Sequence, residues 1–79
     1  MTSSAPPREL YANFIRVGFN AFEFLLDLGT FFPDSDSASI DTRVITNPCD
    51  AKAFAQLLLE TIIRYEDKFG PIAPRTLHD

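Results

Sequence analysis

The chain has 79 residues, which is enough for one small domain. Its net charge of −4 argues against a nucleic-acid backbone or an anionic membrane as the main partner, because both attract basic surfaces. No apolar run approaches the roughly 18 residues of a membrane-spanning helix. The single cysteine excludes an internal disulfide, and the first residues lack the regions of a secretory signal, so we expect a cytoplasmic protein without membrane association.

Both ends of the chain are expected to be flexible. Residues 1–9 are polar, contain two prolines and have no periodicity, which predicts a flexible N-terminal arm. Two further prolines in residues 71–79 exclude a continued helix and predict a flexible C-terminal tail. The folded part is then a single domain of residues 10–70, close to the lower size limit for a chain without disulfides or metals.

Three strands are expected in the first half of this domain. Residues 12–19 alternate with the period of two that is typical of a strand, and residues 20–23 form a turn. Residues 24–30 form the second strand, with Phe31 and Phe32 left open as an extension of it. A loop at residues 33–39 is rich in turn-forming residues, and residues 40–46 form the third strand.

One long helix is expected to follow. Asn47 is a favourable N-cap, Pro48 suits the first helical position, and Gly70 with Pro71 ends the helix. An apolar stripe at helical spacing comprises Ala51, Phe54, Ala55, Leu58, Ile62, Tyr65 and Phe69. The predicted fold class is therefore α+β: a three-stranded antiparallel β-meander followed by one long C-terminal helix packed on one sheet face.

Apolar side chains remain after this packing. The second sheet face carries Phe14, Leu25 and Ile45, and the helix carries more apolar residues beside its stripe. Burying a large apolar side chain stabilises by roughly 1.5–3 kcal/mol, so a surplus apolar surface favours self-association. We predict a homodimer or higher oligomer; the alternative is that long flanking side chains cover these residues in a monomer. The candidate interface residues are Phe14, Leu25, Ile45, Leu57, Leu59 and Ile63.

Three charged residues are expected to form a ladder across the second sheet face. A four-residue turn at 20–23 sets Arg16 opposite Asp27, and Arg43 reaches Asp27 from the third strand. The favoured interpretation is a structural charge ladder, exposed or half-buried in an oligomer interface. The alternative is that the two arginines bind an anionic ligand while Asp27 orients them.

Four short motifs occur in order along the chain: YANFIRV (11–17), EFLLDLG (23–29), TRVI (42–45) and, at the end of the helix, RYEDKFG (64–70). Together they resemble the bacterial family known as domain of unknown function 3467. The resemblance implies small bacterial proteins without an established activity, and it includes Arg16, Asp27 and Arg43. Residues 20–22 depart from the usual proline-containing turn, and the 33–39 loop is rich in Asp and Ser, so no partner is carried over.

Ordinary catalytic chemistry is not evident. The one histidine, His78, lies in the expected tail, where no base is held beside a nucleophile. One cysteine and one histidine make no metal site. Cys49 lies in the first helical turn, where the dipole favours a thiolate, but Asp50 opposes this, so we interpret it as a semi-buried structural residue. We expect no cofactor and no enzymatic activity.

Three functions are therefore compared. The first is a non-enzymatic homo-oligomeric module that assembles with itself or with another protein. The second is a protein that binds single-stranded nucleic acid or another anionic ligand through Phe14, Arg16 and Arg43, which the acidic total disfavours. The third is an enzyme with a site composed across subunits.

Overall fold

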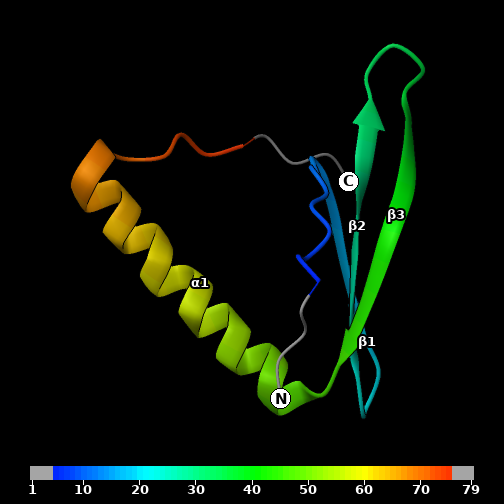
Figure 1. Ribbon diagram of the computed structural model, residues 1–79, viewed down its shortest axis with the longest axis horizontal. Helices are drawn as coiled ribbons and strands as arrows, with labels where there is room; N and C mark the ends of the chain where they lie inside the picture. Colours follow the sequence, from blue (N-terminus) through cyan, green and yellow to red (C-terminus); the bar gives the residue numbers. More distant parts are fainter. Residues whose placement is uncertain (1–4, 76–79) are drawn as a thin grey trace. The chain divides into compact units, whose positions relative to one another are not determined.

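The computed structural model describes residues 5–75 as a sheet followed by a helix. The elements are β1 (Phe14–Phe19), β2 (Phe24–Phe32), β3 (Ser37–Thr46) and α1 (Pro48–Phe69). The antiparallel strands have the order β1-β2-β3, so β2 lies in the middle (Figure 1). The predicted α+β meander and helix are confirmed. His78 and the outermost parts of the predicted arm and tail lie outside the described residues.

The chain divides after Asn47 into a sheet unit and a helix unit, each of which is described by itself. The packing of α1 on one sheet face therefore stays a prediction.

The β1–β2 turn is held by one asparagine. The Asn20 side-chain oxygen accepts hydrogen bonds from the backbone N–H groups of Phe22 and Glu23, at 2.8 and 2.9 Å. The Asn20 N–H donates to the Glu23 carbonyl at 2.9 Å. Asparagine favours turns because its side chain can bond to the backbone two residues ahead. This turn pairs Phe19 with Phe24 and sets the register of the whole hairpin as the sequence predicts.

The β2–β3 hairpin is longer than predicted. β3 begins at Ser37 rather than at residue 40, and β2 continues through Phe32. The tight turn between them places Asp36 at φ 51°, a left-handed conformation that aspartate tolerates. The turn lets Ser37 pair with Phe32 and Ala38 with Phe31, although serine and alanine have weak strand propensity. The geometry of the turn therefore sets the start of β3 at Ser37, which the side-chain pattern does not predict.

A β-bulge interrupts this hairpin beside Gly29. Leu28 pairs with Thr42 and Gly29 pairs with Ile40, so Asp41 is the extra residue on β3. Gly29 is buried, and a Cβ atom there would overlap the carbonyl oxygen of Ser39 and lie 3.0 Å from the Ile40 Cα. Only glycine permits this close approach of the two backbones.

The start of β1 is fixed by a side chain that bonds to the sheet backbone. The Asn13 N–H donates to the Gly29 carbonyl at 3.1 Å, and the Asn13 side-chain oxygen accepts from the Phe31 N–H at 2.8 Å. The amide oxygen thus takes the place of the backbone carbonyl that an extended β1 would offer to the Phe31 N–H, so β1 needs no residue opposite Phe31.

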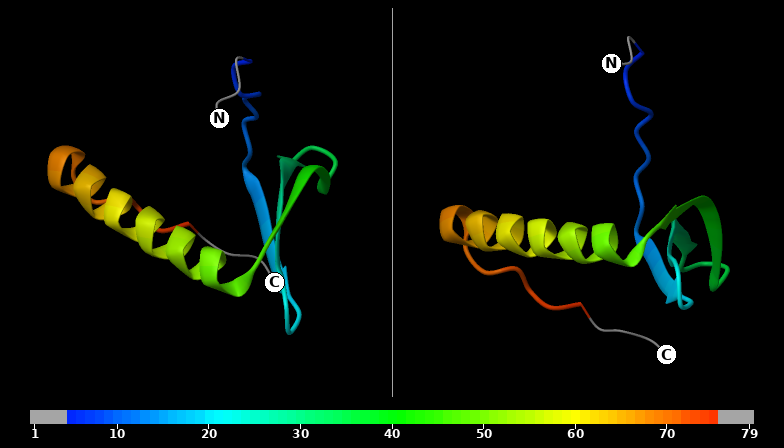
Figure 2. Two further views of the ribbon diagram at one scale, coloured as in Figure 1. Left: turned by 60° about the horizontal axis from the view of Figure 1, so that its bottom comes forward. Right: turned by 90° about the horizontal axis from the view of Figure 1, so that it is seen from below.

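α1 is a single unbroken helix in both views of Figure 2, and its predicted ends are confirmed. Pro48 begins the helix, and Gly70, at φ 97°, ends it by donating its N–H to the Glu66 carbonyl at 2.9 Å. The Glu66 carboxylate then accepts a hydrogen bond from the Ile72 N–H at 2.8 Å, which holds the chain after the helix. No helix in residues 5–75 is long and apolar enough to cross a bilayer.

Apolar burial is missing from both units. No hydrophobic side chain among residues 5–75 is buried, and the helix contains no buried residue of any kind. A three-stranded sheet usually needs its apolar face covered, and an isolated helix of this length is marginal in water. Both units therefore require a covering surface for stability.

Gly29→Ala tests the close approach at the bulge. We expect it to lower the free energy of unfolding by about 1–3 kcal/mol, because the new methyl group must displace the backbone at Ser39. Gly18→Ala is the matched control, since a Cβ there meets no atom within 4 Å. Equal thermal stability of the two variants would contradict the role of Gly29.

Candidate functional site

The strand registers assign each side chain to one of two sheet faces. Arg16 pairs with Asp27 across β1 and β2, and Asp27 pairs with Arg43 across β2 and β3. Because side chains alternate along a strand, all three point to the same side, which we call the ladder face. The opposite side, the apolar face, carries Ile15, Val17, Phe19, Phe24, Leu26, Leu28 and Val44.

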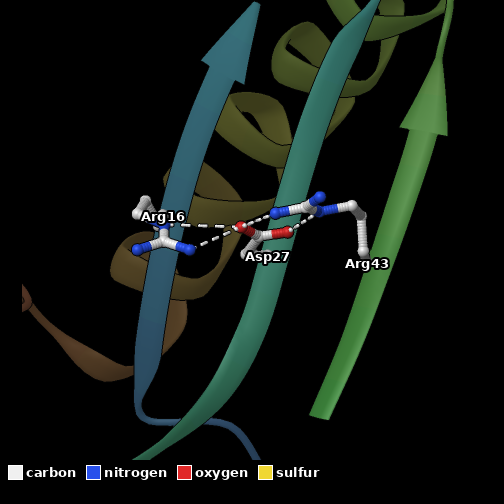
Figure 3. A network of polar contacts seen from close by, with 3 residues as sticks. All are labelled: Arg16, Asp27 and Arg43. Carbon is white, nitrogen blue, oxygen red and sulfur yellow. Dashed lines mark hydrogen bonds and ion pairs between the residues drawn. The ribbon is translucent and has the colours of Figure 1, made fainter. Parts of the chain in front are cut away.

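The structure brings Arg16, Asp27 and Arg43 into direct contact (Figure 3). Arg43 binds the carboxylate with two groups: its Nε lies 2.7 Å from Oδ1 and its Nη2 lies 3.0 Å from Oδ2. Arg16 donates from Nε and Nη2 to Oδ2, at 3.3 and 3.1 Å. The paired geometry at Arg43 is the stronger of the two, because a guanidinium matches both carboxylate oxygens.

The carboxylate of Asp27 is buried by its own partners. Asp27 is only 4% exposed, whereas the side chains of Arg16 and Arg43 are 60% and 53% exposed. The sequence predicts a ladder that is exposed or half-buried in an oligomer interface, and Asp27 itself is more buried than this within one chain, because the central strand and two guanidinium groups enclose it. Hydrogen bonds from Arg43 and then Arg16 lower the Asp27 pKa to about 2, although removal from water opposes this shift.

The ladder face combines a charged centre with apolar neighbours. Two guanidinium groups share one carboxylate, so the ladder carries one net positive charge in a chain of net charge −4. Phe14 and Leu25 are half-buried beside it and Ile45 is exposed. The surface is suited to a partner that offers both apolar contacts and an acidic group.

The helix has apolar side chains around most of its circumference. At 100° per residue, the large ones extend over about 240°, from Leu57 through the central stripe to Ile63. Leu57, Leu59 and Ile63 are 63%, 59% and 51% exposed. An amphipathic helix that packs on one surface needs a stripe of only about 100°. The helix therefore presents enough apolar surface for two contacts.

The six candidate interface residues fall on three separate surfaces. Phe14, Leu25 and Ile45 share the ladder face, Leu57 lies on one border of the helical stripe, and Leu59 and Ile63 lie on the other. Cys49 is exposed, whereas the sequence predicted that it is semi-buried. Within residues 5–75, no group of three or more His, Cys, Asp or Glu side chains is placed to hold a metal ion.

Sequence reasoning missed two residues that position the ladder. Asn13 fixes the start of β1, and Gly29 fixes the distance between β2 and β3 two residues after Asp27. An asparagine directly before a strand indicates a side chain that can bond to the sheet backbone. A glycine inside a strand indicates a bulge or a close approach of two backbones.

The pH dependence of stability tests the ladder. The folded pKa of Asp27, about 2, lies below its ordinary value of 3.8. Ionised Asp27 therefore stabilises the fold fully above about pH 4, and this contribution is lost as the pH falls toward 2. We expect Asp27→Asn to unfold at a lower temperature than wild type at neutral pH, with the difference shrinking as thermal unfolding is followed down to about pH 2.

Asp34→Asn is the control for this series, because it removes an exposed carboxylate that has no arginine partner among the described residues. A constant difference between wild type and Asp27→Asn at all pH values would show that the lost contribution is not that of an ionised ladder.

The comparisons with known proteins bear on the chain as a whole. No curated protein and no solved structure matches it. One family model, described as Protein of unknown function (DUF3467), matches residues 2–74, which is nearly the entire sequence. The chain therefore belongs to the DUF3467 family.

Proposed function

We propose that this protein is a non-enzymatic homo-oligomeric module that assembles with itself and offers a surface to another protein. The observation that carries the proposal is the apolar arc of about 240° on α1, together with the absence of any buried hydrophobic side chain in residues 5–75. We place the protein in the cytoplasm of a bacterium, where a lone exposed thiol such as Cys49 stays reduced.

Self-association follows from the size of this arc. If the sheet covered one stripe of about 100°, the rest of the arc would still face water. Each large side chain left there forgoes roughly 1.5–3 kcal/mol of burial, so several such residues favour a further contact. A second copy carries the same surplus, and a twofold interface buries both at once.

The ladder supports a binding role better than a catalytic one. A general base works best with a pKa near the operating pH, whereas the Asp27 pKa is lowered to about 2. Ionised Asp27 is instead suited to orienting Arg16 and Arg43. Phe14, Leu25 and Ile45 provide apolar contacts beside them. This composition favours an acidic, partly apolar protein segment as the second partner.

A second candidate function is binding of single-stranded nucleic acid or another anionic ligand on the ladder face. Its support is the net positive charge of the ladder and the exposure of both guanidinium groups. The net charge of −4 opposes it, because the rest of the chain repels a polyanion.

Solution mass tests the oligomer. Light scattering at high micromolar concentration is expected to give at least a dimer for wild type. Leu59→Glu/Ile63→Glu is expected to weaken association at least about tenfold, because charges replace apolar side chains at the border of the arc.

The matched control is Ala53→Glu/Gln56→Glu, which adds the same charge on the polar side of the same helix, about two turns earlier. This variant is expected to keep the wild-type mass. A monomeric wild type would contradict the proposal. Equal effects of the two variants would show that added charge alone, and not the loss of apolar side chains at the border of the arc, controls association.

Binding of a fluorescent single-stranded oligonucleotide separates the two candidate functions. The proposed protein-interaction role predicts no binding even at low salt. Salt-sensitive binding that Arg16→Gln/Arg43→Gln abolishes would favour the second candidate.

A further inference from the structure

We propose that α1 pairs with α1 of a second copy as an antiparallel two-stranded coiled coil, with the twofold axis crossing the pair at the level of residue 60 along the helix. The inference rests on the proposed self-association and names the surface and the orientation that produce it. Its evidence lies in the order of residues along the helix.

A seam with the spacing of a coiled coil runs along the whole helix; it is the apolar stripe with Pro48 added and Phe54 left beside it. Along this seam, steps of three and four residues alternate without a break, which is the heptad pattern that keeps one seam facing a partner helix. The helix is about three heptads long. The seam comprises Pro48, Ala51, Ala55, Leu58, Ile62, Tyr65 and Phe69.

Side-chain size selects the antiparallel orientation. The seam is small at its N-terminal end, with Ala51 and Ala55, and bulky at its C-terminal end, with Tyr65 and Phe69. An antiparallel pair centred at Glu60 sets each small residue against a large one. Its layers are Ala51 with the partner's Phe69, Ala55 with the partner's Tyr65, and Leu58 with the partner's Ile62.

A parallel pair would place each residue against its own copy. Alanine would then meet alanine at one end and phenylalanine would meet phenylalanine at the other, so one end would be underfilled and the other forced apart. Alternating large and small residues across a seam fills space at native density.

The residues beside the seam are complementary in the same orientation. On one side, Lys52 faces the partner's Glu66, and Leu59 faces its own copy next to the axis. Lys52 has no carboxylate within ion-pair distance among the described residues of its own chain. Glu66 uses Oε2 to bind the Ile72 N–H, which leaves Oε1 for the partner's lysine.

The other side of the seam is complementary as well. Phe54 there faces the partner's Lys68, and Lys68 already lies 5.5 Å from the ring centre of Phe69 in its own chain. Lysine is attracted to the face of an aromatic ring, so this arrangement suits both neighbours. Leu57 and Ile63, at the two borders of the arc, remain available for a second contact.

The distance between the two Cys49 residues of a dimer distinguishes the antiparallel from the parallel orientation, and labelling Cys49 requires no substitution. It is exposed and lies eleven residues from Glu60, so the antiparallel pair separates the two cysteines by about 33 Å along the axis. A parallel pair brings them to the same end, within about 20 Å. Nitroxide labels on Cys49 of the full chain, measured by pulsed electron paramagnetic resonance, are expected to give the long distance.

Charge exchange tests the contacts themselves. Lys52→Glu and Glu66→Lys are each expected to weaken dimerisation about tenfold in analytical ultracentrifugation, because each makes two like-charge pairs per dimer. The double exchange Lys52→Glu/Glu66→Lys is expected to restore the wild-type dissociation constant to within about twofold. In a parallel pair these residues do not meet, so the double exchange would be no tighter than the single variants.

The outcomes separate this inference from the proposed function. A wild-type monomer overturns both. A wild-type oligomer with a short Cys49 distance, or one in which the double exchange fails to restore association, overturns the antiparallel pairing and leaves the oligomeric module standing. A long distance together with restoration supports the pairing.

Discussion

This small protein has more apolar side-chain surface than its own elements bury, and its stability depends on how that surface is covered. The sheet unit presents a mainly apolar face and a mixed face, and the helix unit is apolar around about two thirds of its circumference. Neither unit buries one hydrophobic side chain in the part of the chain that is described. Conformational entropy opposes the order of both units, and burial is the term that offsets it. The proposed assembly would therefore contribute to stability as well as to function.

The charge ladder gives the sheet a fixed register in the absence of a core. Asp27, in the middle strand, is held by one arginine from each neighbouring strand, so a slip of either strand by one residue would remove one of its two arginine partners. Asn20 and Gly29 set the two hairpins that bring these strands together. Local turn chemistry and one ion network thus specify the sheet.

Most of the fold could be predicted from the sequence because its signals are local. The Asn20 turn determines the pairing of Arg16 with Asp27, and Pro48 and Gly70 mark the ends of the helix. The early start of β3 was missed because a left-handed Asp36, and not strand propensity, sets it. The burial of Asp27 was missed because it depends on how two long side chains fold over a carboxylate, which spacing along the chain does not report.

Chemical unfolding at two protein concentrations tests most directly the claim that the chain is stable only as an assembly. If folding and association are one event, a hundredfold increase in concentration adds about 2.7 kcal/mol to stability. The urea midpoint is then expected to rise by about 1 M for a denaturant dependence of about 2–3 kcal/mol/M. A midpoint that does not change with concentration would contradict the account, because it would show that one chain covers its own apolar surface.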